Sequence, residues 1–115
     1  MAHSTEHHSA TQQHKLDELI SEAYAATGIL PTIDDCRRLN EQLRAAIKEL
    51  ADEVRRRRDQ MPARSRDWYR CDRLLADTGP LLAEDMGAGL LSAAMHVAEL
   101  GRHCQMLRDC IREAR

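Results

Sequence analysis

The sequence predicts an all-α fold, an antiparallel four-helix bundle with two long and two shorter helices. Apolar residues recur at helical spacing in four segments, and no segment shows the alternation of apolar and polar residues that a half-buried strand has. The chain of 115 residues is 43% hydrophobic but only 3% aromatic, without phenylalanine, and this composition favours helices over strands. Short turns join the four segments, so chain neighbours are expected to lie antiparallel.

The segment 34–60 is the longest expected helix, and the other segments are organised around it. Thr32 or Asp34 is expected to cap its first turn. Its apolar residues follow one another at steps of 3, 4, 4, 3 and 4 and form one narrow stripe: Cys36, Leu39, Leu43, Ile47, Leu50 and Val54. About 25 helical residues at ~1.5 Å each make a rod of ~40 Å, too long for one short neighbour to cover. Self-association would cover the remainder, so a homodimer is expected; a monomer with every stripe covered internally would remove this argument.

The N-terminal part predicts a tail and a short helix. Residues 1–12 are polar and rich in histidine, without periodic apolar residues, and are expected to be a disordered tail in front of a single domain, 13–115. Residues 13–27 have the apolar spacing of a short amphipathic helix that Gly28 ends. The residues before Pro31 are expected to cross to the next helix in an extended conformation.

The C-terminal half predicts two more helices. Residues 64–78 carry apolar residues at helical spacing, and Gly79–Pro80 is expected to end this helix because proline has no backbone N–H to continue it. Residues 90–112 form the second long helix. Gly101 lies on its apolar stripe, where the missing side chain favours the close approach of a neighbouring helix. The first long helix is the expected neighbour.

Charge and cysteine content narrow the class of protein. A net charge of −2 gives no overall attraction to nucleic acid or to an anionic membrane. No apolar run approaches the ~20 residues of a membrane span, and the first residues lack the apolar stretch of a secretion signal, so a cytoplasmic location is expected. The four cysteines are then expected to be reduced thiols. Arginine outnumbers lysine 15 to 2, which indicates a high-GC genome.

The spacing of cysteine and histidine gives little support to metal binding or catalysis. Cys36, Cys71 and Cys104 are expected to pack as small apolar side chains; the alternative is that they converge, with His103, on a metal. The predicted helices hold no CxxC, HxxxH or ExxH spacing, so no metal and no cofactor are expected. Cys104 and His103 are adjacent and point ~100° apart on a helix, which prevents a nucleophile–base pair. Without a glycine-rich anion loop or a nucleophile elbow, the sequence leans away from an enzyme and offers no catalytic residue.

The arginine-rich turn between the second and third helices is the surface expected to meet a partner. Residues 52–73 hold eight arginines and five acidic residues, a local balance of 8 − 5 = +3. The residues expected to make the contact are Arg55, Arg56, Arg58, Arg64, Trp68 and Tyr69. The alternative is nucleic-acid binding by the 55–73 hairpin, because arginines can track phosphates while aromatic rings stack on bases. Pairs such as Asp67–Arg70 argue against it, since they neutralise the surface locally.

The C-terminal third resembles a known family. The resemblance begins at Gly79–Pro80 and continues along the last helix at His96, Val97, Leu100, Arg102, Cys104 and Leu107. Over residues 20–110 the chain resembles a family of short, uncharacterised helical proteins of high-GC bacteria that are associated with natural-product biosynthesis. This resemblance implies an all-helical fold and a place among biosynthetic genes, and it implies no catalytic residue.

These observations predict a non-enzymatic helical bundle that serves protein interaction or regulation. Its expected partners are an unknown protein and a second copy of the chain. Two alternatives from other classes remain at this point, a nucleic-acid-binding accessory protein and a small metal-binding bundle. The first would show binding that weakens steeply with salt, and the second would retain metal through its cysteines.

Overall fold

The computed structural model describes residues 2–26, 28 and 30–113, with side chains described from residue 12 onward. Its four helices are α1 (Ala2–Ala25), α2 (Ile33–Asp59), α3 (Arg66–Ala83) and α4 (Leu90–Glu113). The described residues form no strand. The prediction of an all-α helical bundle is therefore confirmed.

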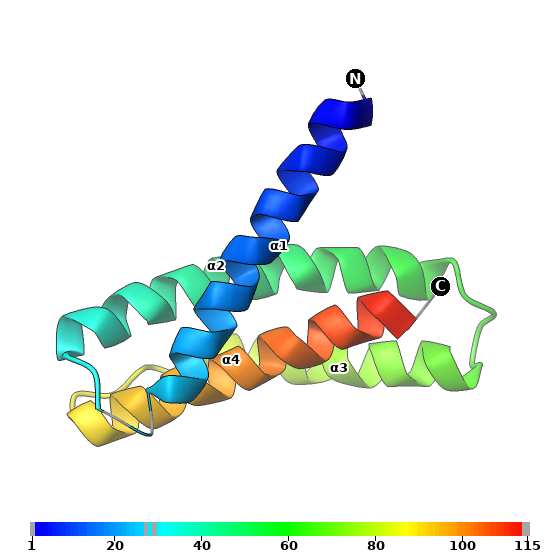
Figure 1. Cartoon of the computed structure of the whole chain (residues 1–115). Helices are drawn as coiled ribbons and strands as arrows, with labels where there is room; N and C mark the ends of the chain where they lie inside the picture. The colour runs from blue at the N-terminus through cyan, green and yellow to red at the C-terminus, as the bar shows by residue number, and fades with distance from the viewer. Residues whose placement is uncertain (1, 27, 29, 114–115) are drawn as a thin grey trace.

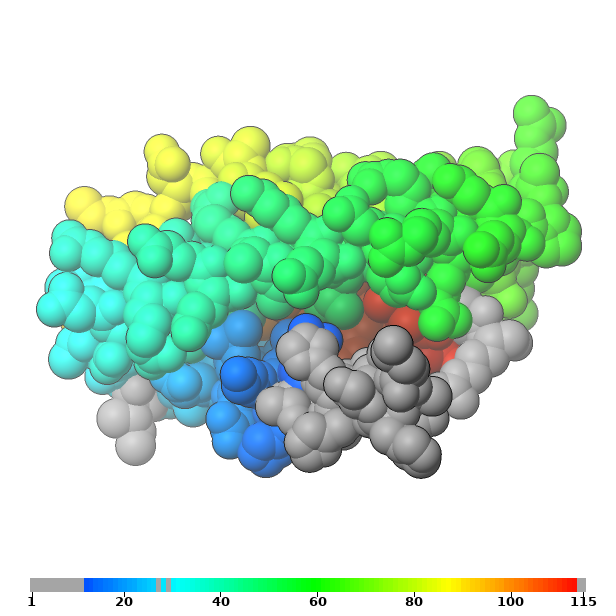
Figure 2. All heavy atoms as spheres, turned by 90° about the horizontal axis from the view of Figure 1, so that it is seen from above, coloured from blue at the N-terminus to red at the C-terminus, as the bar shows by residue number. Residues whose placement is uncertain are grey.

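The helices are arranged around a central pair (Figure 1). α2 and α4 lie side by side and run in the same direction. α3 runs in the opposite direction, from the end of α2 to the start of α4. α1 crosses α4 and α2 at a steep angle and projects beyond them with its N-terminal half. Seen from above, α1 lies along one flank of α2 and α3 along the other (Figure 2). Within the described residues α1 and α3 make no contact with each other, so each covers a different side of the central pair.

The predicted stripe of α2 forms the centre of the core. Every residue of that stripe is buried except Leu50, which is half-buried, while Ala51 takes a buried place beside it. α4 is buried over a wider face than its stripe predicts, because it touches all three other helices. Leu50 turns away from α4 toward α1. This position makes it part of the surface described in the next subsection.

Side chains cap the N-terminal ends of α2 and α3, and the cap predicted at Thr32 is confirmed. The side chain of Thr32 accepts a hydrogen bond from the backbone N–H of Asp35 at 3.1 Å, and that of Ser65 accepts one from the N–H of Trp68 at 3.3 Å. Each serves a backbone donor that the first turn of a helix leaves without a partner. The starts of α2 and α3 therefore follow from local sequence.

The end predicted for α3 is wrong. The helix continues through Gly79–Pro80 to Ala83, with Pro80 inside it. Pro80 only removes the bond to the carbonyl four residues before it. At the C-terminal end of the helix, Arg44 from α2 donates to the carbonyls of Leu82 and Glu84. A guanidinium at this place satisfies orphan carbonyls and opposes the negative end of the helix dipole.

α1 begins earlier than predicted. It starts at Ala2, so it runs through the segment 1–12 that was expected to be a disordered tail, although the side chains up to residue 11 and all of Met1 lie outside the described part. That segment contains neither glycine nor proline, and nothing in it forbids helix. At its other end α1 stops at Ala25, and the N–H of Gly28 donates to the Ala25 carbonyl at 3.0 Å.

Gly101 lies at a close approach of two helices, as predicted, but the neighbour is α1 and not α2. A Cβ atom at position 101 would lie 2.6 Å from the Cβ atom of Ala23. Both residues are buried. Two small residues therefore allow α1 to cross α4 at close range, and this crossing fixes where α1 sits.

Candidate functional site

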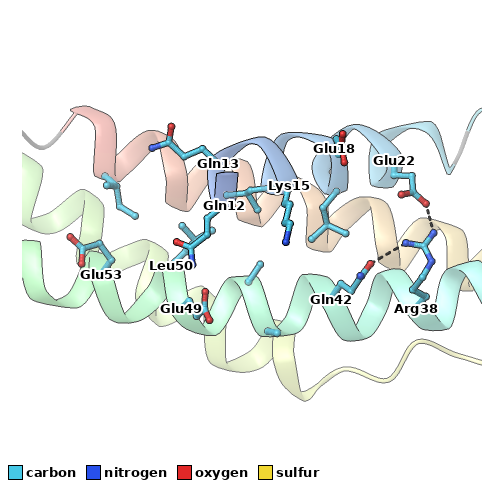
Figure 3. A pocket seen from close by; sticks show the side chains of 15 residues that line it. Gln12, Gln13, Lys15, Glu18, Glu22, Arg38, Gln42, Glu49, Leu50 and Glu53 are labelled. Atoms are coloured by element: carbon cyan, nitrogen blue, oxygen red, sulfur yellow. Dashed lines mark hydrogen bonds and ion pairs between the residues drawn. The ribbon is translucent and has the colours of Figure 1, made fainter. Parts of the chain in front are cut away.

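A wide groove lies between α1 and α2 in the described part of the chain. Its volume is about 860 Å³, within the range of small-molecule sites. Figure 3 shows α1 and α2 as its two walls, with α4 behind them. Sequence analysis missed this groove, because it forms between two helices whose crossing angle no local pattern encodes.

The floor of the groove is apolar. It is made by residues from three helices that are partly buried and pack against the core: Leu16, Leu19, Ala46, Leu50 and Ile111. Ala45, exposed on α2, extends it outward. Apolar surface in a concave site that remains open to water gains free energy when another apolar surface covers it, by roughly 25 cal/mol per Å².

The rim of the groove is charged and acidic on balance. Four glutamates and two cations line it, a balance of 2 − 4 = −2: Glu18, Glu22, Glu49, Glu53, Lys15 and Arg38. At one end Arg38 bridges from α2 to Glu22 on α1 and also donates to Gln42 at 3.0 Å (Figure 3). The Arg38–Glu22 bridge connects the two walls at this end.

Away from the Arg38–Glu22 bridge, some charged side chains of the groove make no ion pair with another described residue. Glu53 accepts hydrogen bonds from Arg56 and Arg57, and the Arg56 contact is the main cause that keeps the pKa of Glu53 below its usual value. Lys15 extends from α1 toward α2 (Figure 3), and among the described side chains neither Lys15 nor Glu49 is recorded in an ion pair. The groove therefore offers at least one anionic and one cationic side chain to an incoming partner.

The predicted partner surface at the arginine-rich turn is only partly assembled. Arg58 comes together with the aromatic rings: its guanidinium carbon lies 5.9 Å from the centre of the Trp68 ring, and Trp68 meets Tyr69 edge-on with ring centres 5.3 Å apart. Tyr69 is 53% exposed, whereas Trp68 is half-buried. Arg64 lies in the turn with a left-handed φ of 63°.

The other arginines of this surface are turned toward acids. Arg55 pairs with Asp52 at 2.8 Å and Arg56 with Glu53 at 2.6 Å, both within α2, while Arg58 also pairs with Asp72 at 2.8 Å. Ion pairs of this kind reduce the charge that is free to meet phosphate groups. The geometry of the turn therefore favours intramolecular contacts over an extended basic surface.

The candidate metal ligands Cys36, Cys71, His103 and Cys104 do not converge. Cys71 lies against Cys110, with sulfur atoms 2.8 Å apart, and the Cys104 sulfur lies 3.9 Å from the Leu43 carbonyl oxygen. All four cysteines are buried and free. Burial raises the pKa of Cys104 to about 12, which keeps it a neutral thiol.

His103 has a structural hydrogen bond. Its Nε2 lies 2.8 Å from the hydroxyl oxygen of Thr78, whose own proton goes to the Leu74 carbonyl at 2.8 Å. Nε2–H must therefore be the donor to Thr78, since a hydroxyl has only one proton to give. The resulting chain of two bonds satisfies polar groups that are buried between α3 and α4.

One group of possible metal ligands does come together, and sequence analysis missed it. Among the described residues these are Glu84, His96 and Glu99, whose ligand atoms all lie within 4.8 Å of one another. His96 and Glu99 are three residues apart on α4, a spacing that could have indicated this pair. However, the Arg44 guanidinium lies 3.5 Å from His96 Nε2, so a fixed positive charge already occupies the neighbourhood. His96 lies beside both Arg44, which caps α3, and the Glu84 carboxylate, 3.9 Å from its Nδ1.

Comparison with known proteins adds a family. A family of unknown function, DUF6415, matches residues 10–115. No curated protein and no solved structure gives a significant match. The predicted resemblance to an uncharacterised family is thus confirmed, over more of the chain than expected. In the part of the chain that the structure describes, no helix is long and apolar enough to span a membrane.

Proposed function

Since the chain belongs to DUF6415, a family of unknown function, we propose that it is a non-enzymatic protein-interaction module that holds an amphipathic helix of another protein in the groove between α1 and α2. The observation that carries the proposal is the groove itself, with its apolar floor and charged rim. This combination is how helix-binding grooves work: apolar residues at i, i+3, i+4 and i+7 of the bound helix enter the floor while its polar residues meet the rim.

The shape of the bundle supports a helix as the occupant. α1 touches α2 much less than it touches α4, so the face of α2 toward the groove lacks a full helical neighbour. That face carries Ala45 and Ala46, which allow a close approach, followed by Leu50. An incoming helix would contact α1, α2 and the end of α4, and it would complete the layer that α1 leaves open.

The charge of the rim indicates what kind of helix fits. Because the rim carries a net charge of 2 − 4 = −2, a helix with lysines or arginines beside its apolar face is attracted and an acidic one is repelled. An acidic residue of the partner is favoured only opposite Lys15. A basic amphipathic helix is therefore the proposed ligand class.

A designed peptide tests this proposal. The probe is a synthetic 20-residue helix with leucines at i, i+3, i+4 and i+7 and lysines on its other face, and the measurement is its titration into ¹⁵N-labelled protein. The largest chemical-shift changes are expected at Ala46, Leu50 and Ile111. A peptide with glutamates in place of the lysines should bind more weakly. Changes centred on Trp68 and Tyr69, or no saturable changes, would contradict the proposal.

A matched pair of variants separates the groove from general effects. Ala45→Arg places a long cation on an exposed position of the groove, and Ala76→Arg places the same side chain on an exposed position of α3. We expect Ala45→Arg to weaken peptide binding about tenfold or more, which corresponds to ~1.4 kcal/mol, and Ala76→Arg to leave it unchanged. Equal effects would show that the peptide does not use the groove.

Oligomeric state, location and pathway are further parts of the proposal. The long stripes of α2 and α4 are largely covered within one chain, so they no longer argue for a homodimer. A second copy stays a possible occupant of the groove, and sedimentation equilibrium of the free protein tests it. The 15-to-2 ratio of arginine to lysine supports a high-GC bacterial host. On the resemblance described above we propose a cytoplasmic role beside natural-product biosynthesis. Nucleic-acid binding by residues 55–73 stays a prediction.

A further inference from the structure

A pair of buried thiols joins the start of α3 to the end of α4. Cys71 lies in the second turn of α3 and Cys110 in the last turn of α4, and these ends meet because the two helices run in opposite directions. Their sulfur atoms are 2.8 Å apart, and the residues are 1% and 3% exposed. A covalent S–S bond of ~2.05 Å needs only a small further approach.

The surroundings of the two sulfur atoms suit the formation of a bond. A small void of about 10 Å³ borders both cysteines, so neither sulfur atom is closely packed on every side. Around it lie Met61, Asp67 and the Arg70–Glu113 ion pair, which connects the same two helix ends at the surface. The backbone is thus already held in register by a non-covalent link beside the thiols.

The other two cysteines are kept apart from this pair. Cys104 lies one face further round α4, with its sulfur 3.9 Å from the Leu43 carbonyl oxygen. Cys36 lies in the first turn of α2, at the opposite end of the bundle from Cys110. Their positions leave Cys71 and Cys110 with one cysteine partner each.

We propose that Cys71 and Cys110 form a redox-active dithiol that closes to an intramolecular disulfide when the protein meets a low-molecular-weight disulfide. One thiolate attacks a sulfur atom of the small disulfide and releases one thiol. The second cysteine then attacks the mixed disulfide and releases the other thiol. The protein loses two electrons and two protons, and the small disulfide gains them as two thiols.

The environment of Cys110 makes this exchange slow at neutral pH. Burial and the neighbouring Cys71 raise the pKa of Cys110 to about 12, while the positive charge of Arg70 partly opposes the shift and Glu113 adds to it. Few Cys110 thiolates are therefore present in the closed fold, and attack by Cys110 depends on local opening at the end of α4. Once formed, the bond is protected by the same burial.

The disulfide would strengthen a short interface. α3 touches α4 over much less surface than it touches α2, so the cross-link adds a constraint where few contacts exist. It also closes a loop of about 40 residues, a length for which cross-linking stabilises folded proteins markedly. We expect the oxidised protein to melt about 10 °C or more above the reduced protein.

The test uses the whole wild-type protein in excess oxidised glutathione. After the free thiols are blocked, a non-reducing tryptic map should show peptide 71–73 linked to peptide 109–112, with Cys36 and Cys104 carrying the blocking group. The urea-unfolded chain in the same buffer is the reference, because it should give a mixture of pairings. Reductant should remove both the link and the rise in melting temperature.

Two outcomes would overturn the inference. The first is a folded chain that keeps four free thiols under conditions that oxidise the unfolded chain. The second is a link that involves Cys36, Cys104 or another molecule. The variant Cys36→Ser/Cys104→Ser should retain the 71–110 link, and Cys110→Ser should lose it. Because none of these measurements involves the helical peptide, failure here leaves the proposed function untouched.

Discussion

The two helices that flank the α2–α4 pair are held in different ways. α3 is capped at both ends, by Ser65 and Arg44, and it buries leucines such as Leu74 along its length. α1 is buried at its C-terminal end, around Ala23, whereas its leucines nearer the N-terminus are only half-buried. The comparison teaches that one flank of the central pair is closed as core and the other is left as an accessible surface.

The largest expected effect compares a leucine on each flank. Leu74→Ala on α3 is expected to lower the free energy of unfolding by about 2–4 kcal/mol, because a nearly buried side chain is replaced by a cavity. Leu16→Ala in the groove floor is expected to cost less than ~1.5 kcal/mol, because that side chain still meets water. Urea unfolding followed by circular dichroism measures both. Equal losses would mean that α1 is as much a part of the core as α3.

A smaller effect is expected at the α1–α4 crossing. Gly101→Ala brings a Cβ atom within 2.6 Å of the Ala23 Cβ atom and should cost about 1–3 kcal/mol of stability through overpacking. Ala23→Gly in the same chain should restore part of the loss, which a double-mutant cycle measures.

The control for this substitution lies on the other flank. Gly79→Ala in α3 adds a methyl group with no atom within 4 Å, so helix propensity alone should raise stability by up to ~1 kcal/mol. If both glycine variants were equally stabilising, α1 would be free to shift away from α4, and the crossing would not fix its position.

The smallest expected effect concerns acid on the α3 flank. Burial lowers the pKa of His103 below its usual value of 6.5, although the carboxylates of Asp77 and Glu99 partly oppose the shift. As the pH falls, His103 therefore takes up a proton in the unfolded chain before it does so in the folded chain. The contribution of neutral His103 to the free energy of unfolding is complete above pH ~6.5 and is lost as the pH falls from 6.5 toward the folded pKa. Urea unfolding on either side of this pH should show a larger loss for wild type than for His103→Gln. Parallel losses would remove His103 as the cause.

The features that could be predicted from the sequence are those with a local cause. Cys36, Leu43 and Val54 are buried together because only helical periodicity brings such spacings to one face. The caps at Thr32 and Ser65 involve backbone groups three residues away. The end of α3 has a distant cause, because Arg44 reaches carbonyls that are 38 residues or more away in the chain. Local rules for glycine and proline therefore placed that end too early.

The candidate site could not be predicted for the same reason. Leu50 fits the stripe of α2 in sequence, yet it faces the groove because α1 crosses at an angle that the contact between Gly101 and Ala23 sets. The contact between Cys71 and Cys110 also could not be predicted from local sequence. Spacing separates Cys71 from Cys110 by 39 residues, and only the antiparallel course of α3 and α4 brings their sulfur atoms together.

The contact between Ala23 and Gly101 is a point around which α1 could tilt. From Ala23 to Gln12 the helix extends ~16 Å, so a tilt of about 10° around that contact would move Gln12 by ~3 Å. The bridge from Arg38 to Glu22 lies close to the pivot, where a tilt displaces atoms least, and it can therefore persist while the far end swings. Such a tilt would change the width of the groove while the contacts among α2, α3 and α4 stayed in place.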